Sequence, residues 1–252
     1  MSETNTIKVT TGKELYNYQK IAIEEIFQKF DSAVEDYHLL YQLPTGGGKT
    51  VIFSEIVRRY ISKFNKKVLV LTHRIELSKQ TSNMLNEFGV PNKVINSTAK
   101  LDDQDNYDCF VAMVETLKNR LNDDKLDISD IGLVIVDEAH YNSFTKIFKF
   151  FDDSFILGVT ATPLSSNIKL PMYENYQELY VGETIEDLIE NRYLASANMF
   201  SYNVGLTSLE VGANGDYTVK SSEDLYTNVD MLSKLVGAYE ETSKGKKTLI
   251  FN

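Results

Sequence analysis

The stretch Pro44-Thr45-Gly46-Gly47-Gly48-Lys49-Thr50 decides the fold of this chain. It follows the apolar run Leu39-Leu40-Tyr41 and precedes a helical pattern over Val51–Phe64. Consecutive glycines let the backbone turn tightly, so that its N–H groups point at phosphate oxygens. A strand, such a loop and a helix in succession are typical of a phosphate-binding loop. We therefore expect a nucleoside triphosphate site at this position.

The side chains of this loop suggest how the phosphates are held. Lys49 would reach the β- and γ-phosphates, and the Thr50 hydroxyl would bind Mg²⁺. The helix that begins here adds the positive end of its dipole to the anion site. Leu43 stands where the pattern usually has its first glycine or alanine. The alternative is a glycine-rich turn without a ligand, which the flanking strand and helix disfavour.

Two acidic residues follow another apolar run. Asp137 and Glu138 come directly after Leu133–Val136, so we expect them at the end of a buried strand, facing the phosphate loop. Asp137 would hold Mg²⁺, and Glu138 would orient and deprotonate an attacking water. Two surface acids at a strand end are a common alternative, but a phosphate loop upstream favours the catalytic interpretation.

The residues around these motifs alternate between helix and strand patterns. Apolar residues that include Ile21 recur at helical spacing over residues 14–30, and a further helix is expected over Glu76–Phe88. Buried strands are predicted at Leu39–Tyr41, Val68–Leu71, Phe110–Met113, Leu133–Val136 and Phe155–Leu157. This order predicts an α/β fold, in which a parallel sheet has helices on both faces and binds ligands at the carboxyl ends of its strands.

The pattern loosens after Pro163. The expected elements are a loop over Ser165–Tyr176, a helix over Ile185–Asn191 capped by Thr184, a strand over Ala197–Val204, a hairpin turning at Asn214-Gly215 between 209–211 and 217–219, and a helix over Val229–Thr242. Lys247–Asn252 has the pattern of a buried strand that stops at the last residue, which suggests a truncated chain. We expect a nucleotide-binding domain over residues 1–168, followed over 169–252 by a connecting segment and the first strand of a second domain.

Composition limits the class of protein. Hydrophobic residues make up 42% of the chain and charged residues 25%, as in globular proteins. No apolar run approaches the ~18 residues of a membrane helix, and Cys109 is the single cysteine. We therefore expect a soluble, cytoplasmic protein without a membrane partner. The net charge of −10 argues against a broad basic surface for nucleic acid and leaves room for a few loop contacts.

The three histidines do not suggest a metal centre. His38, His73 and His140 lack metal-ligand spacing with each other and with Cys109. His38 is interpreted as a residue at the start of a strand.

The ordered motifs resemble those of superfamily 2 helicases and translocases of the DEAD/DEAH type. Lys13–Gln19 is similar to the Q motif, Leu71–Leu77 to motif Ia, Ala112–Leu117 to motif Ib, Asp137–His140 to motif II and Thr160–Pro163 to motif III. The segments His73–Leu77 and Thr184–Ile189 look closest to the DNA enzymes of the RadD, UvsW and restriction-motor group. Lys247–Asn252 resembles the start of motif IV in a second RecA-like domain.

This resemblance implies a first RecA-like domain with ATP and Mg²⁺ as cofactors. The implied ATP-binding residues are Tyr18, Gln19, Thr45, Gly46, Gly47, Gly48, Lys49 and Thr50; Lys49, Asp137 and Glu138 would act in catalysis, with Thr50 and Asp137 on the metal. His140, Thr160 and Thr162 would couple hydrolysis to movement, and Thr72, His73, Arg74 and Thr116 would grip nucleic-acid phosphates.

Two departures from the family pattern matter. Tyr16 stands where the Q motif usually carries an arginine, which affects part of the adenine contact. Motifs V and VI, with their arginine fingers, are absent, and a finger contributes ~10³-fold or more to the rate. We therefore expect this chain alone to hydrolyse ATP slowly and to need a second RecA-like domain for full activity.

The sequence predicts the ATP-binding half of an ATP-dependent DNA helicase or translocase. One alternative is an RNA helicase of the same superfamily, which these motifs do not separate cleanly from the DNA enzymes. A small-molecule kinase or other ATPase with a phosphate loop is disfavoured by motifs Ia and III. A non-catalytic ATP-binding or partner-docking module is the remaining alternative.

Overall fold

The computed structural model describes residues 14–33, 37–96, 106–122, 130–141, 144–165, 167, 169–203, 206–213 and 215–249. The chain divides into two compact units, Met1–Ala195 and Ser196–Asn252. Several sequence predictions lie partly outside the described residues, among them Lys13 of the Q motif, residues 166 and 168 of the loop, Val204 of the strand over 197–204, Asn214 of the hairpin turn and residues 250–252 of the last strand.

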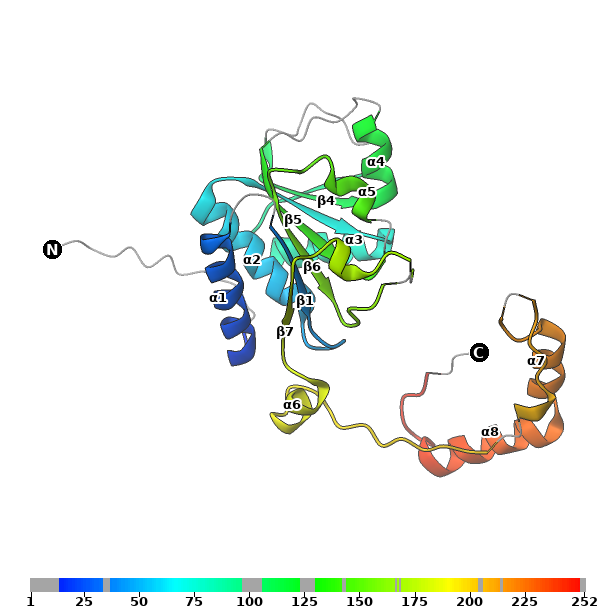
Figure 1. The fold of residues 1–252 in the computed structure, drawn as a ribbon. Helices are drawn as coiled ribbons and strands as arrows, with labels where there is room; N and C mark the ends of the chain where they lie inside the picture. The colour runs from blue at the N-terminus through cyan, green and yellow to red at the C-terminus, as the bar shows by residue number, and fades with distance from the viewer. Residues whose placement is uncertain are drawn as a thin grey trace. The chain divides into compact units, whose positions relative to one another are not determined.

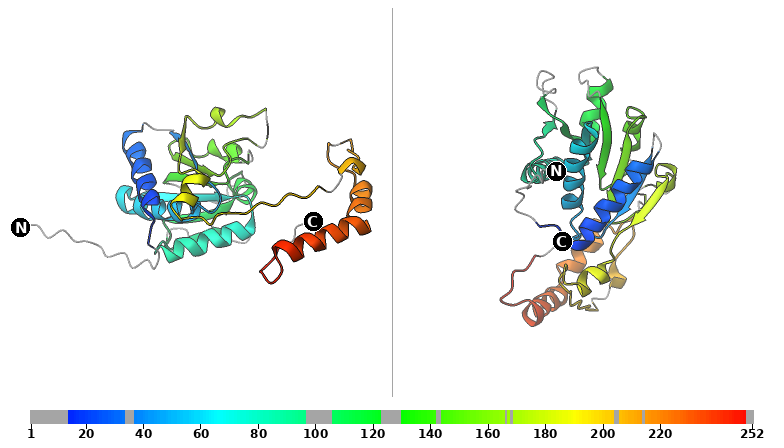
Figure 2. Two further views of the ribbon diagram at one scale, coloured as in Figure 1. Left: turned by 90° about the horizontal axis from the view of Figure 1, so that it is seen from below. Right: turned by 90° about the vertical axis from the view of Figure 1, so that its left-hand side faces the viewer.

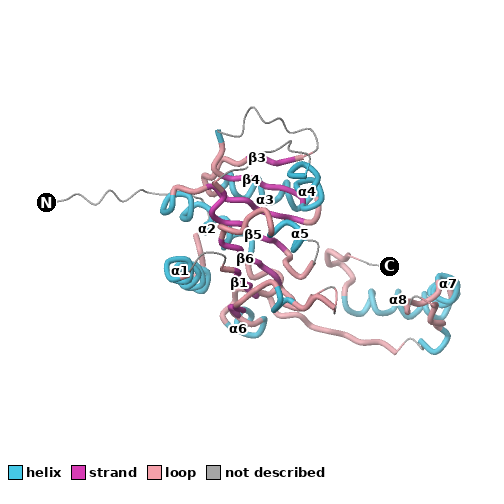
Figure 3. Tube along the Cα trace, turned by 45° about the horizontal axis from the view of Figure 1, so that its top comes forward, coloured by secondary structure: helices cyan, strands magenta, loops and turns pink. Residues whose placement is uncertain are grey.

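A seven-stranded sheet forms the centre of the first unit, in the order β3-β4-β2-β5-β6-β1-β7 (Figures 1 and 3). Neighbouring strands pair in parallel. Their bounds are β1 His38–Gln42, β2 Lys67–Thr72, β3 Lys93–Ile95, β4 Cys109–Met113, β5 Ile131–Asp137, β6 Phe155–Thr160 and β7 Glu178–Val181. The five expected strands are confirmed, whereas β3 and β7 were not predicted.

Helices cover both faces of this sheet, as expected. Their bounds are α1 Asn17–Ser32, α2 Lys49–Phe64, α3 Ile75–Glu87, α4 Val114–Asn122, α5 Thr145–Phe148 and α6 Ile185–Glu190, with a short 3₁₀ helix, η3, at Met172–Glu174. Helices α1, α2 and α3 contribute side chains to one core, and α4 and α5 to the other; Figure 1 shows the helices around the sheet. Along β2, Val70 belongs to the first core and Leu69 to the second, because successive strand residues face opposite sides.

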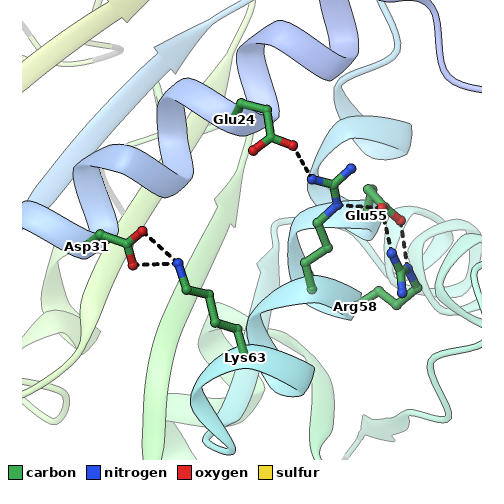
Figure 4. A network of polar contacts seen from close by, with 6 residues as sticks. Glu24, Asp31, Glu55, Arg58 and Lys63 are labelled. Atoms are coloured by element: carbon green, nitrogen blue, oxygen red, sulfur yellow. Dashed lines mark hydrogen bonds and ion pairs between the residues drawn. The ribbon is translucent and has the colours of Figure 1, made fainter. Parts of the chain in front are cut away.

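Helix α1 is fixed against α2 by ion pairs as well as by apolar packing. Arg59 contacts Glu24 at 2.5 Å, and Lys63 contacts Asp31 at 2.6 Å (Figure 4). The nearly buried Glu55 accepts from both Arg58 and Arg59 at 2.7 Å. These contacts hold the helix that follows the phosphate loop. Ile21, which we expected on the apolar face, is instead 50% exposed, because it lies on the side of α1 that faces away from the core.

The first unit extends past residue 168, the limit expected from the sequence. Strand β7 pairs with β1 at the sheet edge, and α6 follows it. Thr184 caps α6, as expected, by accepting from the Asp187 N–H at 3.1 Å. Arg192 then takes a left-handed backbone conformation with φ of 60°. The N–H groups of Tyr193 and Leu194 both donate to the Leu188 carbonyl, which turns the chain back along α6.

The second unit contains a 3₁₀ helix, η4, at Leu206–Ser208 and two helices, α7 at Val219–Tyr226 and α8 at Val229–Thr242, drawn orange to red in Figure 2. Helix α8 has the predicted bounds, and α7 was not predicted. The expected strand over 197–204 is wrong for its described residues: no strand forms over 197–203, and Met199 is 93% exposed. The expected hairpin is reduced to one antiparallel bridge between Val211 and Tyr217.

The end of the described chain also differs from expectation. Residues 247–249 form no strand, and Leu249 is 76% exposed instead of buried, because no neighbouring strand in the described part of this unit pairs with it. None of the helices that the structure describes has the length and apolar character that a membrane crossing needs.

Candidate functional site

The sequence motifs meet at the carboxyl edge of the sheet. Asp137 is the last residue of β5 and Thr160 the last of β6, and Thr160 lies opposite Gln42 at the end of β1. The phosphate loop begins directly after β1 and ends where α2 begins at Lys49. Because β5, β6 and β1 are consecutive in the sheet, the loop and the acidic pair lie side by side, as predicted.

Gly48 and Gly47 of the phosphate loop leave no room for a Cβ atom. Gly48 has a φ of +83°, and a Cβ there would lie 2.6 Å from Gln19 Nε2. A Cβ on Gly47 would lie 2.8 Å from Leu43 Cγ, so the Leu43 side chain leaves no room for a larger residue at this position. Leu43 is fully buried in the core, which accounts for an apolar residue where the pattern usually has glycine or alanine.

The polar groups of the loop contact one another. The Gly47 N–H donates to the Pro44 carbonyl at 3.1 Å, and Lys49 Nζ donates to the Leu43 carbonyl at 3.4 Å. Both donors are groups that the sequence assigns to phosphates. On phosphate binding, the Gly47 N–H and Lys49 Nζ would therefore leave these carbonyls and donate to the phosphate instead.

Tyr18 and Gln19 hold the loop from the opening helix. Tyr18 Oη donates to the Gly47 carbonyl at 2.7 Å, and Gln19 Nε2 lies 3.5 Å from the same oxygen. The other end of the Gln19 amide, Oε1, accepts from the Tyr16 N–H at 3.0 Å. Burial raises the pKa of the Tyr18 hydroxyl, so this donor keeps its proton at neutral pH. Adenine recognition by Gln19 stays a prediction.

Two residues far along the chain join this region, and no sequence pattern pointed to them. The Tyr193 ring lies 4.7 Å from the Tyr16 ring and 4.9 Å from the Tyr18 ring, measured between centroids. Leu194 covers Gly46, since a Cβ on that glycine would be 2.8 Å from Leu194 Cδ2. The turn after α6 thus packs directly on the phosphate loop.

In the acidic pair, Asp137 is buried and Glu138 is half-buried, and Asp137 is electrostatically linked to the loop. Asp137 is 7% exposed, and its Oδ1 accepts from the Glu138 N–H at 3.0 Å. Burial and the neighbouring Glu138 raise the pKa of Asp137 to about 6, while the charge of Lys49 lowers it. Glu138 has a φ of 53°, a strained conformation for a residue with a side chain. A buried carboxylate that one lysine only partly compensates fits a cation such as Mg²⁺, with Thr50 at the start of α2 as second ligand.

The three predicted coupling residues contact one another. His140 Nδ1 lies 3.0 Å from Thr160 Oγ1 and 3.5 Å from Glu138 Oε2. The buried Thr160 hydroxyl donates to the Thr162 carbonyl at 3.0 Å and accepts from the Thr162 N–H at 3.1 Å. A continuous polar path therefore leads from the acidic pair to the turn after β6.

The four predicted nucleic-acid residues are placed differently from one another. His73 and Arg74 line a cleft of about 530 Å³ that also contains Glu138, His140 and Thr162. Thr72 is fully buried, and its hydroxyl lies 2.6 Å from Ser78 Oγ, so gripping a phosphate would require this contact to open. Thr116 is half-buried in the first turn of α4 and does not line this cleft.

Arg74, His73 and His38 have different surroundings. Arg74 is exposed at the residue preceding α3, and no ion pair joins it to Glu76 among the described side chains. Burial and the charge of Arg74 lower the pKa of His73, which keeps its ring neutral. His38 begins β1, as expected, and its Nδ1 lies 2.7 Å from the Asn175 carbonyl.

Comparison with known proteins identifies relatives of the first unit. Residues 12–165 match the family model described as "Type III restriction enzyme, res subunit". A "51.5 kDa protein" of a Lactococcus phage is 30% identical over 84% of this chain and 43% of its own length. The Saccharomyces cerevisiae protein IRC3, named as an ATP-dependent helicase, is 29% identical over 80% of this chain and 31% of its own. The chain thus spans less than half the length of these curated relatives.

A solved structure supports the fold. The nuclease-deletion mutant of the Type ISP restriction-modification enzyme LlaGI, in complex with a DNA substrate mimic, aligns with a TM-score of 0.57. It is 18% identical, over 72% of this chain and 21% of that one. The RecA-like fold and the resemblance to superfamily 2 helicases are confirmed. Since the family match covers more than half of its residues, this chain belongs to the family of the Type III restriction enzyme res subunit.

Proposed function

We propose that this chain is the ATP-binding part of an ATP-dependent DNA helicase or translocase. The observation that carries the proposal is that the phosphate loop, which ends at Lys49, shares the carboxyl edge of the sheet with the buried Asp137. A cationic loop residue beside a buried carboxylate is what a metal-bound triphosphate requires. The IRC3 relative is named as a helicase, which agrees with this assignment.

In this proposal, the phosphate loop and the acidic pair divide the tasks of ATP hydrolysis between them. The backbone N–H groups of the loop and Lys49 would bind the β- and γ-phosphates. Glu138 would orient a water toward the γ-phosphorus and accept its proton, while the bond to the β–γ bridging oxygen breaks to give ADP and phosphate. Mg²⁺ held by Thr50 and Asp137 would neutralise the charge that develops on the phosphate oxygens.

At the carboxyl edge of the sheet, a series of polar contacts would couple hydrolysis to movement. Glu138 lies beside His140, and His140 contacts Thr160, so a change at the water-activating acid reaches the Thr160–Thr162 turn through two polar contacts. Arg74 and His73 line the same cleft as Glu138, so a nucleic-acid phosphate gripped there would lie next to the hydrolytic groups. We therefore assign the phosphate grip to Arg74 and His73, with Thr116 as an outlying contact.

The type of nucleic acid, the rate of turnover and the cellular location are also part of this proposal. DNA in place of RNA rests on the resemblance of His73–Leu77 and Thr184–Ile189 to DNA enzymes. Rapid turnover would need a second RecA-like domain that brings arginine fingers to the γ-phosphate. A cytoplasmic location also stays a prediction from the sequence.

The test is the ATPase rate of the full-length protein with no nucleic acid, with single- and double-stranded DNA, and with RNA of equal length. We expect Mg²⁺-dependent hydrolysis that DNA stimulates more than RNA does, and no hydrolysis in the Lys49→Ala variant. Stimulation by RNA alone would support the RNA helicase. ATP binding without turnover under any condition would support a non-catalytic module and contradict the proposal.

A further inference from the structure

Tyr141 contacts two histidines that come from different motifs. Its ring lies 4.3 Å from the His73 ring and 4.3 Å from the His140 ring, with interplanar angles of 31° and 37°. His73 follows β2, whereas His140 and Tyr141 belong to the turn after β5. The Tyr141 N–H donates to the Glu138 carbonyl at 3.1 Å, which fixes the backbone that carries the ring.

The position of the His73 ring is set by packing against a neighbouring ring and not by a hydrogen bond of its Nδ1 atom. Within the described part of the chain, His73 Nδ1 is buried and has no hydrogen-bond partner. Burial lowers the pKa of this imidazole, so the ring is neutral and no charge attracts it to a neighbour. The half-buried Tyr141 is the aromatic ring against which it rests, and Tyr141 itself packs on the core beneath α4 and α5.

His140, at the other side of Tyr141, belongs to the hydrolytic machinery. Its Nδ1 lies 3.0 Å from Thr160 Oγ1 and 3.5 Å from Glu138 Oε2. A contiguous path therefore runs from His73 through Tyr141 and His140 to Thr160. Because each ring of this path contacts the next, we expect a displacement of one ring to move its neighbour.

We propose that Tyr141 is a positioning residue that couples His73, and with it the nucleic-acid loop, to His140 and Glu138. Tyr141 touches neither water nor phosphate in this mechanism; it acts through the two imidazoles. The inference rests on the proposed function, since it requires a nucleotide at the phosphate loop and nucleic acid at Arg74.

Histidine NMR provides a direct test, because the chain has only three histidines. The imidazole Cε1–H resonances of the chain are followed while the Mg²⁺ complex of a non-hydrolysable ATP analogue is added, and they are assigned with His73→Gln and His140→Gln. We expect both the His140 and the His73 resonances to shift. Tyr141→Phe, which keeps the ring, should preserve both shifts, whereas Tyr141→Leu should keep the His140 shift and lose that of His73.

A matched control separates coupling from general loosening of the core. Tyr107 is a half-buried tyrosine that packs on the same core as Tyr141. It precedes β4 and therefore lies at the amino ends of the strands, whereas Tyr141 lies at their carboxyl ends. Tyr107→Leu should therefore leave both shifts intact. In the full-length protein, Tyr141→Leu should reduce the ratio of DNA-stimulated to basal hydrolysis by at least about fivefold, whereas Tyr107→Leu should not.

The possible results are distinct. If calorimetry shows that the analogue binds and the His73 resonance still shifts in Tyr141→Leu, or fails to shift in the unaltered chain, the inference is overturned and the proposed function stands. If calorimetry detects no binding of the analogue, the proposed function fails and the inference falls with it.

Discussion

The side-chain amide of Gln19 occupies the space in which Gly48 would carry a Cβ atom, with Nε2 2.6 Å from that position. Gln19 cannot retreat freely, because its amide also contacts the Tyr16 N–H and lies near the Gly47 carbonyl. The opening helix therefore fixes the conformation of the phosphate loop before any ligand arrives. This relationship gives the first prediction.

Gly48→Ala should weaken nucleotide binding at least tenfold, because the new methyl group displaces Gln19 and with it the loop. Gly89→Ala is the matched control: Gly89 also has a positive φ, +72°, but nothing lies within 4 Å of its Cβ position. Both variants carry the strain of a left-handed alanine, roughly 1 kcal/mol. Calorimetric titration with ADP should show normal affinity for Gly89→Ala. Equal loss in both glycine variants would contradict the prediction.

Lys49→Ala and Glu138→Gln should separate binding from chemistry. The first removes the charge that faces the β- and γ-phosphates, so triphosphate affinity should fall. The second removes only the base that activates water, so the affinity should be kept and hydrolysis by the full-length protein abolished. Calorimetry with the ATP analogue and steady-state phosphate release measure the two effects. Wild-type ATP binding by both variants would show that the role given to Lys49 is wrong.

Asp137→Asn should stabilise the nucleotide-free protein at pH 7.5. The pKa of Asp137 is about 6 in the folded chain against an ordinary 3.8, so the folded state binds this proton more tightly than the unfolded state. Stability is therefore lost as the pH rises from about 4 to about 6, and the loss is on the order of 2 to 3 kcal/mol above that range. Asparagine avoids this cost and still accepts from the Glu138 N–H.

Urea unfolding without nucleotide and Mg²⁺ measures this effect. The gain should appear at pH 7.5 and vanish below pH 4, while Asp152→Asn, at an exposed position, should show little gain at either pH. A gain of the same size at both values would mean that burial of the ionised carboxylate is not its cause.

Arg74→Ala should lower DNA-stimulated hydrolysis of the full-length protein while its effect on the rate without DNA stays small. Arg74 is exposed and is the only fixed positive charge among the four residues assigned to phosphates. Binding should be weak and depend only shallowly on salt, since each neutralised phosphate adds roughly 0.7–0.9 to the slope of log K against log salt. Rates with and without DNA at several salt concentrations measure this. Equal loss of both rates would assign Arg74 to the fold or to the nucleotide site.

Tyr193→Trp should report nucleotide binding by fluorescence. The chain contains no tryptophan, so the substituted residue is the only indole, and it lies against Tyr16 and Tyr18 beside the phosphate loop. Emission should change when Mg²⁺ and the ATP analogue are added. Tyr173→Trp serves as the control, because Tyr173 is 79% exposed beside a different cavity, and its emission should stay constant. If the emission of Tyr193→Trp stays constant although calorimetry shows normal affinity, the nucleotide lies away from this cluster.

The sequence identified the centre of the sheet better than its edges. Strands β2 and β5 are buried on both faces, so their apolar runs are continuous and easily recognised. The edge strand β3 has three residues, and β7 alternates between exposed and half-buried positions, so neither gives such a run. In the second unit, apolar residues such as Met199 suggested strands, but a strand forms only where a neighbour pairs with it.

The candidate site was predictable where local motifs specify it. Asp137 ends β5, His140 follows it, and the loop that leads to Lys49 follows β1, so the order of strands and motifs determines that they share one edge of the sheet. Tyr141, Tyr193 and Leu194 could not be found in the same way, because their roles depend on contacts with residues distant in sequence. The burial of Thr72 was not predicted either, because the sequence pattern did not show that β2 extends to this residue.

Leu194 also has a mechanical consequence. It lies at the end of the first unit, directly before the segment that begins at Ser196, and rests on Gly46. Tension on the departing segment would be borne first by the two hydrogen bonds to the Leu188 carbonyl and then transmitted through one aliphatic side chain to the phosphate loop. A load on that segment would therefore act on the phosphate loop through this single turn.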